Sequence, residues 1–212
     1  MNKNEKFVIT INRELGSGGR TVGRIVAEKL GVPFYDKALI RALESKYELT
    51  TEEIERLKSR KRSWWADFKR GMIVGEDAAN STSYYVGSES DLLTTEALFK
   101  AEKEILTGIA EEESCVIAGR SAFFVLNGHP NRLSVLIQAP IEYRIERLMK
   151  KQNMEWKEAM KTINKVDKMR EEYVKNYAQT SRYDTRNYDL VINMAGKTEE
   201  QAANLILSYI ND

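Results

Sequence analysis

Residues 7–31, FVITINRELGSGGRTVGRIVAEKLG, contain the strongest indication of the fold. Its first five residues are apolar or β-branched, a composition typical of a strand that is buried on both faces. A glycine-rich turn follows, and residues 21–30 carry apolar side chains at helical spacing until Gly31 and Pro33 end the helix. A strand, a glycine loop and a helix in this order are the layout of a phosphate-binding loop.

The glycines of this loop suit an anion. Gly16, Gly18 and Gly19 permit backbone conformations that turn several N–H groups toward one point. The first turn of the following helix adds unsatisfied N–H groups and the positive end of its dipole. The alternative is a tight turn that needs glycine for packing alone. The position of the loop between the first strand and a helix favours phosphate binding.

Composition limits the kinds of partner. The 212 residues can form one domain with a full core. With 33 basic and 32 acidic residues the net charge is +1, which argues against a protein that binds nucleic acid through bulk charge. Trp64 and Trp65 stand beside basic residues and could stack on bases, but a helix anchored in the core by a tryptophan fits the balanced charge better. We expect no nucleic-acid partner.

Three features indicate a cytoplasmic protein. The single cysteine, Cys115, cannot form an internal disulfide, as suits a reducing compartment. The apolar run after the basic residues 1–6 is far too short for a secretion signal. No apolar stretch reaches the length of a membrane span, so we expect no membrane partner.

Strand and helix patterns alternate along the whole chain. Further strands are expected at residues 32–36, 114–119, 132–140 and 188–194. Helices are expected at residues 37–47, 50–70, 91–112 and 198–210, residues 141–179 are almost all helix formers, and residues 75–91 read as a loop. This alternation predicts an α/β fold with a five-stranded parallel sheet covered on both sides. In such folds ligands bind at the carboxyl ends of the strands, so residues 12–21, 35–41, 119–124 and 139–147 should converge on one site.

Five segments, in this order, resemble the bacterial cytidylate kinase-like family of P-loop nucleoside monophosphate kinases. They are ITINRELGSGGRTVGRIVAEKLGVPFYDKALIRAL (9–43), VIAGRSAFFVL (116–126), SVLIQAPIEYRIERL (134–148), KVDKMREEY (165–173) and YDLVIN (188–193). The resemblance implies a three-layer P-loop NTPase fold in one domain, residues 1–212, with a helical substrate-binding insertion at about 50–90 and a lid at about 150–180. It also implies transfer of the ATP γ-phosphoryl group to a nucleoside monophosphate, with CMP or dCMP as the first candidates and Mg²⁺ beside ATP.

Matched residue by residue, the family loop implies that residues 16–21 bind the ATP phosphates. Gly16, Ser17, Gly18 and Thr21 match the family, and no gap is needed on either flank.

Three loop positions differ from the family. Gly19 stands in the place of the lysine that supports the β- and γ-phosphates, and Arg20 in that of the serine that binds Mg²⁺. Arg13 stands where the first motif glycine is expected. Arg20 or Arg13 can supply the missing positive charge. Neither binds Mg²⁺, which leaves Thr21 as the local hydroxyl besides Ser17 and leaves metal use open.

The resemblance also implies an acceptor site. Asp36 and Arg41 match its acidic and basic positions, and Arg120 matches an arginine on the monophosphate side. Ser121 replaces an aspartate that helps to recognise a cytidine-type base or sugar. The plainer alternatives are a helix cap for Asp36 and an exposed position at a helix start for Arg120, where a cation is mildly unfavourable.

Arginines of the later helices complete the predicted site. Arg144 and Arg147 lie three residues apart on one helix face. Asp167 and Arg170 match the family lid. With Arg20, we single out Arg147 and Arg170 as catalytic candidates that neutralise charge while the γ-phosphoryl group moves, and hold Lys165 and Lys168 in reserve. The alternative is a solvated, charged helix face.

Two other functions stay open. One is a nucleotide sensor that kept the pocket and lost turnover through Gly19 and Arg20. The other is a kinase of a different small metabolite, which Ser121 and the polar residues 80–91 allow. The long helices at 91–112 and 155–177 also suit a homodimer contact.

Overall fold

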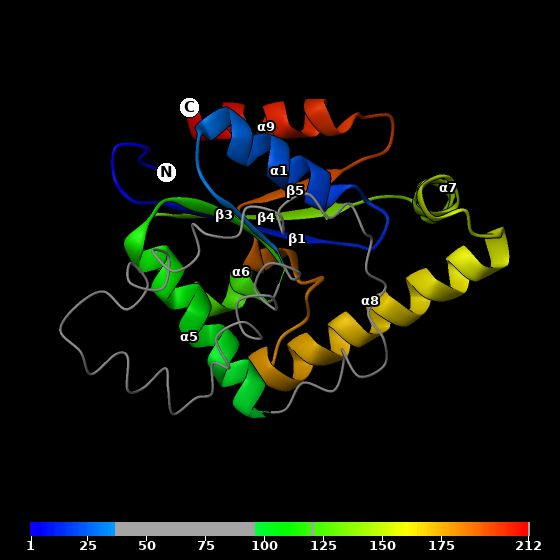
Figure 1. Cartoon of the computed structure of the whole chain (residues 1–212), viewed down its shortest axis with the longest axis horizontal. Helices are drawn as coiled ribbons and strands as arrows, with labels where there is room; N and C mark the ends of the chain where they lie inside the picture. Colours follow the sequence, from blue (N-terminus) through cyan, green and yellow to red (C-terminus); the bar gives the residue numbers. More distant parts are fainter. Residues whose placement is uncertain (37–95, 120, 212) are drawn as a thin grey trace, which may run out of the picture.

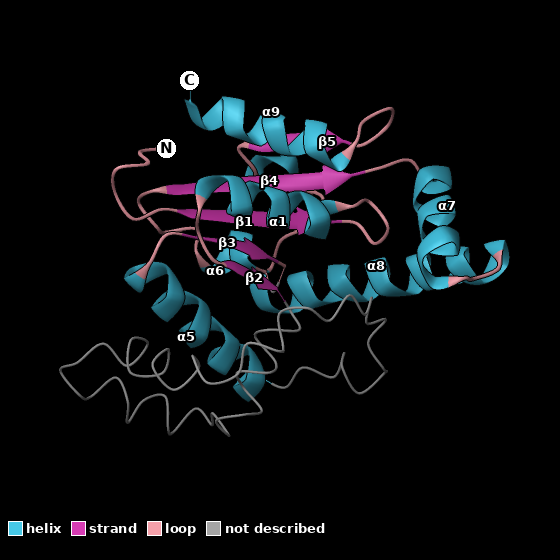
Figure 2. Cartoon of the chain, turned by 45° about the horizontal axis from the view of Figure 1, so that its top comes forward, coloured by secondary structure: helices cyan, strands magenta, loops and turns pink. Residues whose placement is uncertain are grey.

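The computed structural model describes residues 1–36, 96–119 and 121–211. Its parallel sheet has the strand order β2-β3-β1-β4-β5 (Figure 2). The strands are β1 (Val8–Arg13), β2 (Phe34–Asp36), β3 (Cys115–Ala118), β4 (Arg132–Gln138) and β5 (Leu190–Asn193). The predicted five-stranded parallel sheet is thereby confirmed.

Helices cover both faces of the sheet. They are α1 (Gly19–Leu30), α5 (Glu96–Glu112), α6 (Ala122–Val125), α7 (Ile141–Gln152), α8 (Trp156–Ala178) and α9 (Glu199–Asn211), with a 3₁₀ turn at Thr185–Asn187. Helices α1 and α9 pack together on one face, whereas α5, α6 and α8 lie on the other (Figures 1 and 2). The three-layer α/β architecture expected from the sequence is confirmed.

The first strand is buried from both sides, as its β-branched run predicts. Ile9 and Ile11 point into the layer beneath α1 and α9, where they pack with Val22 and Val26. Val8 points the opposite way, into the layer that contains Ile109 of α5. Each such side chain contributes about 1.5–3 kcal/mol when it leaves water. The central strand thus anchors the glycine loop that follows it.

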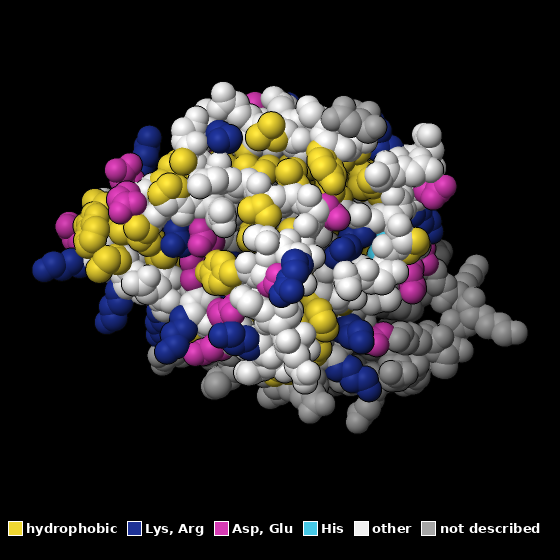
Figure 3. All heavy atoms as spheres, turned by 180° about the vertical axis from the view of Figure 1, so that it is seen from behind, with side chains coloured by type: hydrophobic (Ala, Val, Ile, Leu, Met, Phe, Trp, Pro, Cys, Tyr) yellow, Lys and Arg dark blue, Asp and Glu magenta, His cyan; other side chains and the backbone are white. Residues whose placement is uncertain are grey.

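A sharp turn separates α7 from α8. Asn153 ends α7 in the left-handed conformation, with φ of 52°, which asparagine tolerates better than most residues. Ile145 and Leu148 of α7 then pack against Ile163 of α8. Hydrophobic side chains gather at this end of the molecule (Figure 3), where Trp156 is 47% exposed. The turn sends α8 back past the glycine loop.

The strand register brings the predicted loops to one edge. Ala118 pairs with Ile11 of β1 and with Asp36 of β2. Arg13 pairs with Ile137 on the other side of β1. The ends of β1, β2 and β3 therefore lie side by side, as the topological argument requires.

Several expectations fall outside the described residues. These are the helices at 37–47 and 50–70, the loop at 75–91, the first part of the helix at 91–112, Trp64, Trp65, Arg41 and Arg120. In the part of the chain that is described, no helix combines the length and the apolar character needed to span a bilayer.

Candidate phosphate-binding site

The loop between β1 and α1 is held by its own hydrogen bonds. The Glu14 amide donates to the Ile137 carbonyl at 3.1 Å, which ties the loop to β4. The amide and hydroxyl of Ser17 both donate to the Glu14 carbonyl, at 3.3 and 2.9 Å. Gly16 and Gly18 have φ of 83° and 88°, in the left-handed region that favours glycine. Ser17 is fully buried, so its polar groups shape the loop from within.

Five backbone amides of this loop and helix start are free. Within the described ranges, no acceptor is found for the N–H groups of Gly16, Gly18, Gly19, Arg20 and Thr21. The first turn of α1 holds no acidic residue, and Gly18 offers no capping side chain. A helix start that keeps its donors and its positive dipole end unsatisfied suits an anion.

Arg20 crosses from α1 to the end of β2. Its Nε lies 2.5 Å from Oδ2 of Asp36, a side chain that is 8% exposed. A candidate catalytic residue and a candidate acceptor residue are therefore paired directly. A carboxylate also holds the Arg20 guanidinium at the carboxyl edge of the sheet.

Arg147 links three helices. Its Nη2 donates to Oγ1 of Thr21 at 3.3 Å, and its Nη1 forms an ion pair with Glu199 of α9. Burial acts to raise the pKa of Glu199, but a backbone hydrogen bond and Arg147 together hold that pKa below its ordinary value. Glu199 therefore stays an anion and keeps Arg147 in place.

These contacts do not fit a protein-bound Mg²⁺. Arg20 occupies the place of the serine ligand, and the Thr21 hydroxyl already accepts from the Arg147 guanidinium. A hydroxyl beside a cation is a poor ligand for a second cation. Among the described residues, no group of three or more His, Cys, Asp or Glu side chains could hold a metal ion.

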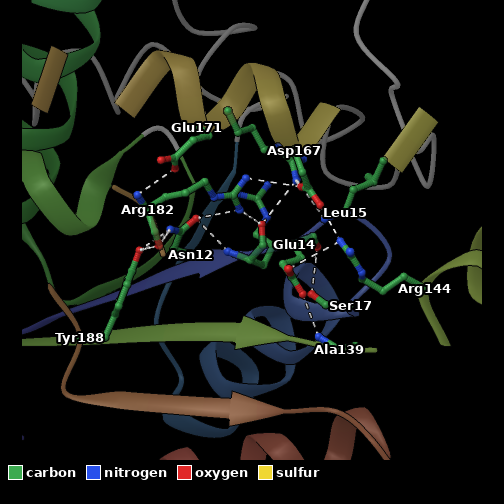
Figure 4. Close-up of polar contacts among 12 residues, drawn as sticks. Asn12, Glu14, Leu15, Ser17, Ala139, Arg144, Asp167, Glu171, Arg182 and Tyr188 are labelled. Atoms are coloured by element: carbon green, nitrogen blue, oxygen red, sulfur yellow. Dashed lines mark hydrogen bonds and ion pairs between the residues drawn. The ribbon is translucent and has the colours of Figure 1, made fainter. Parts of the chain in front are cut away.

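Asp167 of α8 joins the later helices to the loop (Figure 4). Its Oδ1 accepts from the Leu15 amide at 3.0 Å, and its Oδ2 accepts from Arg144 Nη1 at 2.5 Å. Arg170 and Arg182 also reach Oδ1, at 3.5 and 3.4 Å. One buried carboxylate thus orients three guanidinium groups around the loop.

Arg182 is a site residue that the sequence did not reveal. It is 1% exposed and donates to the Arg13 carbonyl and, at 3.4 Å, to Oδ1 of Asn12 (Figure 4). Its own amide donates to Glu171 at 3.1 Å. No signal in the sequence marks Arg182, because it lies between the matched segments 165–173 and 188–193.

The lid candidates separate into two groups. Arg170 faces the loop, where its Nη1 lies 3.4 Å from the Arg13 carbonyl. Burial, and then repulsion by Arg182, lowers the pKa of Arg170 to about 10. Lys165 and Lys168 are exposed, and Lys168 pairs with Glu172 at 3.9 Å on the same helix. The two lysines match the solvated-face alternative.

Arg13 lies against the end of β3. A Cβ added to Gly119 would come within 2.0 Å of Arg13 Nη1, so the guanidinium rests on that glycine. Burial, and then repulsion by Arg170 and Arg182, lowers the pKa of Arg13 to about 9. The groups around the Arg13 guanidinium therefore carry more positive than negative charge.

Ser121 is the remaining described candidate. It precedes α6 with φ of 51°, and its buried Oγ has no hydrogen-bond partner among the described residues. A strained, unpartnered hydroxyl at the end of β3 suits contact with a ligand. The loop, Arg20, Asp36, Arg147, Arg170 and Ser121 all lie at or beside the carboxyl edge of the sheet.

Comparison with known proteins gives the same family as the sequence motifs. A model of the cytidylate kinase-like family matches residues 8–196. The cytidylate kinase of Methanopyrus kandleri is 24% identical over 213 residues, which cover 96% of this chain and 93% of that protein. The uronate isomerase of Corynebacterium glutamicum is 30% identical over 105 residues, or 50% of this chain, but the chain spans only 20% of that protein.

Solved structures share the fold. An uncharacterized protein from Eubacterium ventriosum has a TM-score of 0.69 and 24% identity, over 98% of this chain and 99% of that chain. A shikimate kinase from Bacteroides thetaiotaomicron has a TM-score of 0.51 and 16% identity, over 97% and 99%. At these identities the likeness shows the fold alone. The family match runs from β1 past β5, so the chain belongs to the cytidylate kinase-like family.

Proposed function

We propose that this protein transfers the γ-phosphoryl group of ATP to a nucleoside monophosphate, with CMP and dCMP as the first candidates. The proposal is based on the free amides of Gly16, Gly18, Gly19, Arg20 and Thr21, which arginines surround. Family membership supports a nucleotide-kinase reaction and ATP as the donor, with Mg²⁺ as the usual companion. A cytoplasmic location suits these substrates.

In this proposal the protein acts through position and charge. The loop amides bind the donor phosphates, and Arg147 and Arg170 neutralise charge as the γ-phosphoryl group moves. An oxygen of the acceptor phosphate attacks the γ-phosphorus while the bond to the β,γ-bridging oxygen breaks, which yields ADP and a nucleoside diphosphate. Arg20 connects the two sides through its ion pair with Asp36. No step is assigned to a protein-bound Mg²⁺, because the described residues offer no fitting ligands.

The acceptor side of the proposal extends beyond the described residues. We place the acceptor near Asp36 and Ser121, with Arg41 and Arg120, predicted from the sequence, as the ligands of its phosphate. The insertion at about 50–90 would enclose the acceptor, and residues 150–180, which include α8, would serve as the lid of a single domain.

A nucleotide sensor is the second candidate. Two observations favour it: Gly19 occupies the place of the catalytic lysine, and Thr21 is engaged by Arg147 instead of a metal. Such a protein would bind the same nucleotides and release no ADP.

One assay separates these functions. Purified protein is incubated with ATP, Mg²⁺ and a panel of acceptors (CMP, dCMP, UMP, AMP, and phosphorylated and hydroxylated small metabolites), and ADP is followed against a sample without acceptor. Turnover with CMP or dCMP is expected. Saturable ATP binding with no acceptor-dependent ADP would contradict the kinase proposal and favour the sensor. Turnover with a non-nucleotide acceptor alone would show that the protein is a kinase of a different small metabolite.

A further inference from the structure

Arg13 and Gly19 compete for one volume. A Cβ added to Gly19 would lie 2.6 Å from Arg13 Cβ, closer than real Cβ atoms approach, and a tight 3.2 Å from Arg13 Cγ. Gly19 begins a helix and has no positive φ, so its backbone would accept any residue. The need for glycine at position 19 is therefore steric, and Arg13 causes it. A lysine at 19 cannot coexist with the present Arg13 side chain.

The far end of Arg13 needs a second glycine. The guanidinium lies on Gly119, whose φ is 92°, and a Cβ there would collide with Nη1 and stand 3.0 Å from Cζ. Two glycines that are 100 positions apart in the sequence thus accommodate one side chain. This path takes Arg13 from the end of β1 across the base of the loop to the end of β3.

Arg13 has no ion-pair partner in the described part of the chain. Asp36 acts to raise the pKa of Arg13, but burial, Arg170 and Arg182 each act more strongly in the opposite direction. Arg20, Arg144, Arg147, Arg170 and Arg182 each form an ion pair with a carboxylate. Within residues 1–36, 96–119 and 121–211, the Arg13 guanidinium has neither an ion pair nor a hydrogen-bond acceptor. A confined guanidinium among other cations calls for an anionic ligand, and its fork of donors matches the oxygens of a phosphate.

We propose that Arg13 is the phosphate-binding cation of this loop, delivered from the end of β1 in exchange for the lysine that position 19 has lost. The inference rests on the proposed function, because it assumes that the loop binds polyphosphate. Arg20 is the weaker candidate for this role, since Asp36 already holds its Nε at 2.5 Å. The differences from the family loop at positions 13 and 19 are then one coupled substitution. It moves the phosphate-binding cation from position 19 to position 13 and keeps the phosphate site.

The direct test measures binding without catalysis. Inorganic tripolyphosphate and ATP are titrated by calorimetry in metal-free buffer into the wild type, Arg13→Met, Arg13→Lys and Arg24→Met. The last is a matched control, because Arg24 lies on α1, the helix that follows the loop, but its guanidinium faces the Phe34 ring, 5.8 Å from the ring centroid. Arg13→Met should weaken binding roughly 10- to 100-fold, the range for a lost charge-assisted hydrogen bond. Arg13→Lys should lose less affinity than Arg13→Met, and the affinity of Arg24→Met should stay within about twofold of the wild-type value.

A double mutant tests the exchange itself. Arg13→Gly removes the Cβ that blocks position 19, so Arg13→Gly with Gly19→Lys should bind tripolyphosphate more tightly than Arg13→Gly alone. Gly19→Lys alone should lower the melting temperature, because both side chains then compete for one space. Circular dichroism confirms that each variant is folded.

The outcomes distinguish the inference from the proposed function. Wild-type binding that Arg13→Met leaves within twofold would overturn the role of Arg13 and leave the kinase proposal standing. If the double mutant binds tripolyphosphate no more tightly than Arg13→Gly does, the proposed exchange of Arg13 for a lysine at position 19 is wrong. Absence of tripolyphosphate and ATP binding by the wild type would contradict the proposed function and the inference with it.

Discussion

Asp167 of α8 accepts a hydrogen bond from the Leu15 amide, with 3.0 Å between N and Oδ1. The same carboxylate pairs with Arg144 at 2.5 Å. A residue of the predicted lid is therefore bonded to the backbone of the predicted phosphate loop. The two halves of the candidate site are joined by the Asp167 side chain, which is 11% exposed.

Asp167→Asn should destabilise the protein by about 3 kcal/mol, because removal of one charge leaves buried guanidinium groups without a counter-ion. Urea unfolding at pH 7 measures the change. Asp184→Asn is the matched control, since Asp184 pairs with Arg186 at the surface, and its midpoint should move little. Equal urea midpoints for the two variants would show that Asp167 does not stabilise the fold by balancing the charge of these guanidinium groups.

Arg13→Met should raise stability while it lowers phosphate affinity. The substitution keeps the volume of the stem and removes a confined charge that faces Arg170 and Arg182. We expect a gain of about 1–2 kcal/mol, which thermal unfolding without ligand would detect. A lower melting temperature for Arg13→Met would mean that the charge is balanced within the protein and needs no ligand.

The gain in stability that we expect from Arg13→Met should depend on pH. Burial and neighbouring arginines lower the pKa of Arg13 to about 9, well below the ordinary value that an arginine has in the unfolded chain. Between these values the unfolded chain holds a proton that the folded protein has lost, so the wild type is stabilised as pH rises through this window. The stability difference should be largest below about pH 8 and shrink above about pH 9. Unfolding curves for both proteins across this range test it, and a constant difference would contradict it.

Gly119→Ala should displace the Arg13 guanidinium and weaken tripolyphosphate binding about as much as Arg13→Met does. Gly31→Ala supplies the control, because Gly31 also has a positive φ, 66°, but has no atom within 4 Å of an added Cβ. Both variants bear the backbone strain of about 1 kcal/mol. Calorimetry should therefore show a binding defect for Gly119→Ala alone. Equal affinities would argue against the contact between Arg13 and Gly119.

Local patterns were sufficient to predict the sheet and the loop. The β-branched run that ends in Ile11, the glycines and the helix stop at Gly31 all act within a few residues, and the structure places them as expected. The sequence also located Arg20 and Asp36, although their direct ion pair was not foreseen.

Contacts between residues that are far apart in the chain could not be predicted from the sequence. Arg182 contacts Asn12, 170 positions away, and neither its neighbours nor its spacing mark it. The sequence showed Gly19 in the place of a lysine, but only a distance in the structure reveals that the Arg13 side chain blocks a larger residue there. Likewise, Thr21 matched a motif, yet its hydroxyl is engaged by Arg147 from a distant helix.

The most direct test follows the phosphoryl group itself. ATP labelled in its γ-phosphoryl group is incubated with CMP or dCMP and with wild-type, Arg13→Met or Arg24→Met protein, and the labelled products are separated. We expect label in CDP or dCDP with the wild type and Arg24→Met, and roughly 10- to 100-fold less label with Arg13→Met at limiting ATP. Label that stays in ATP, or that appears only as inorganic phosphate with every acceptor, would contradict it.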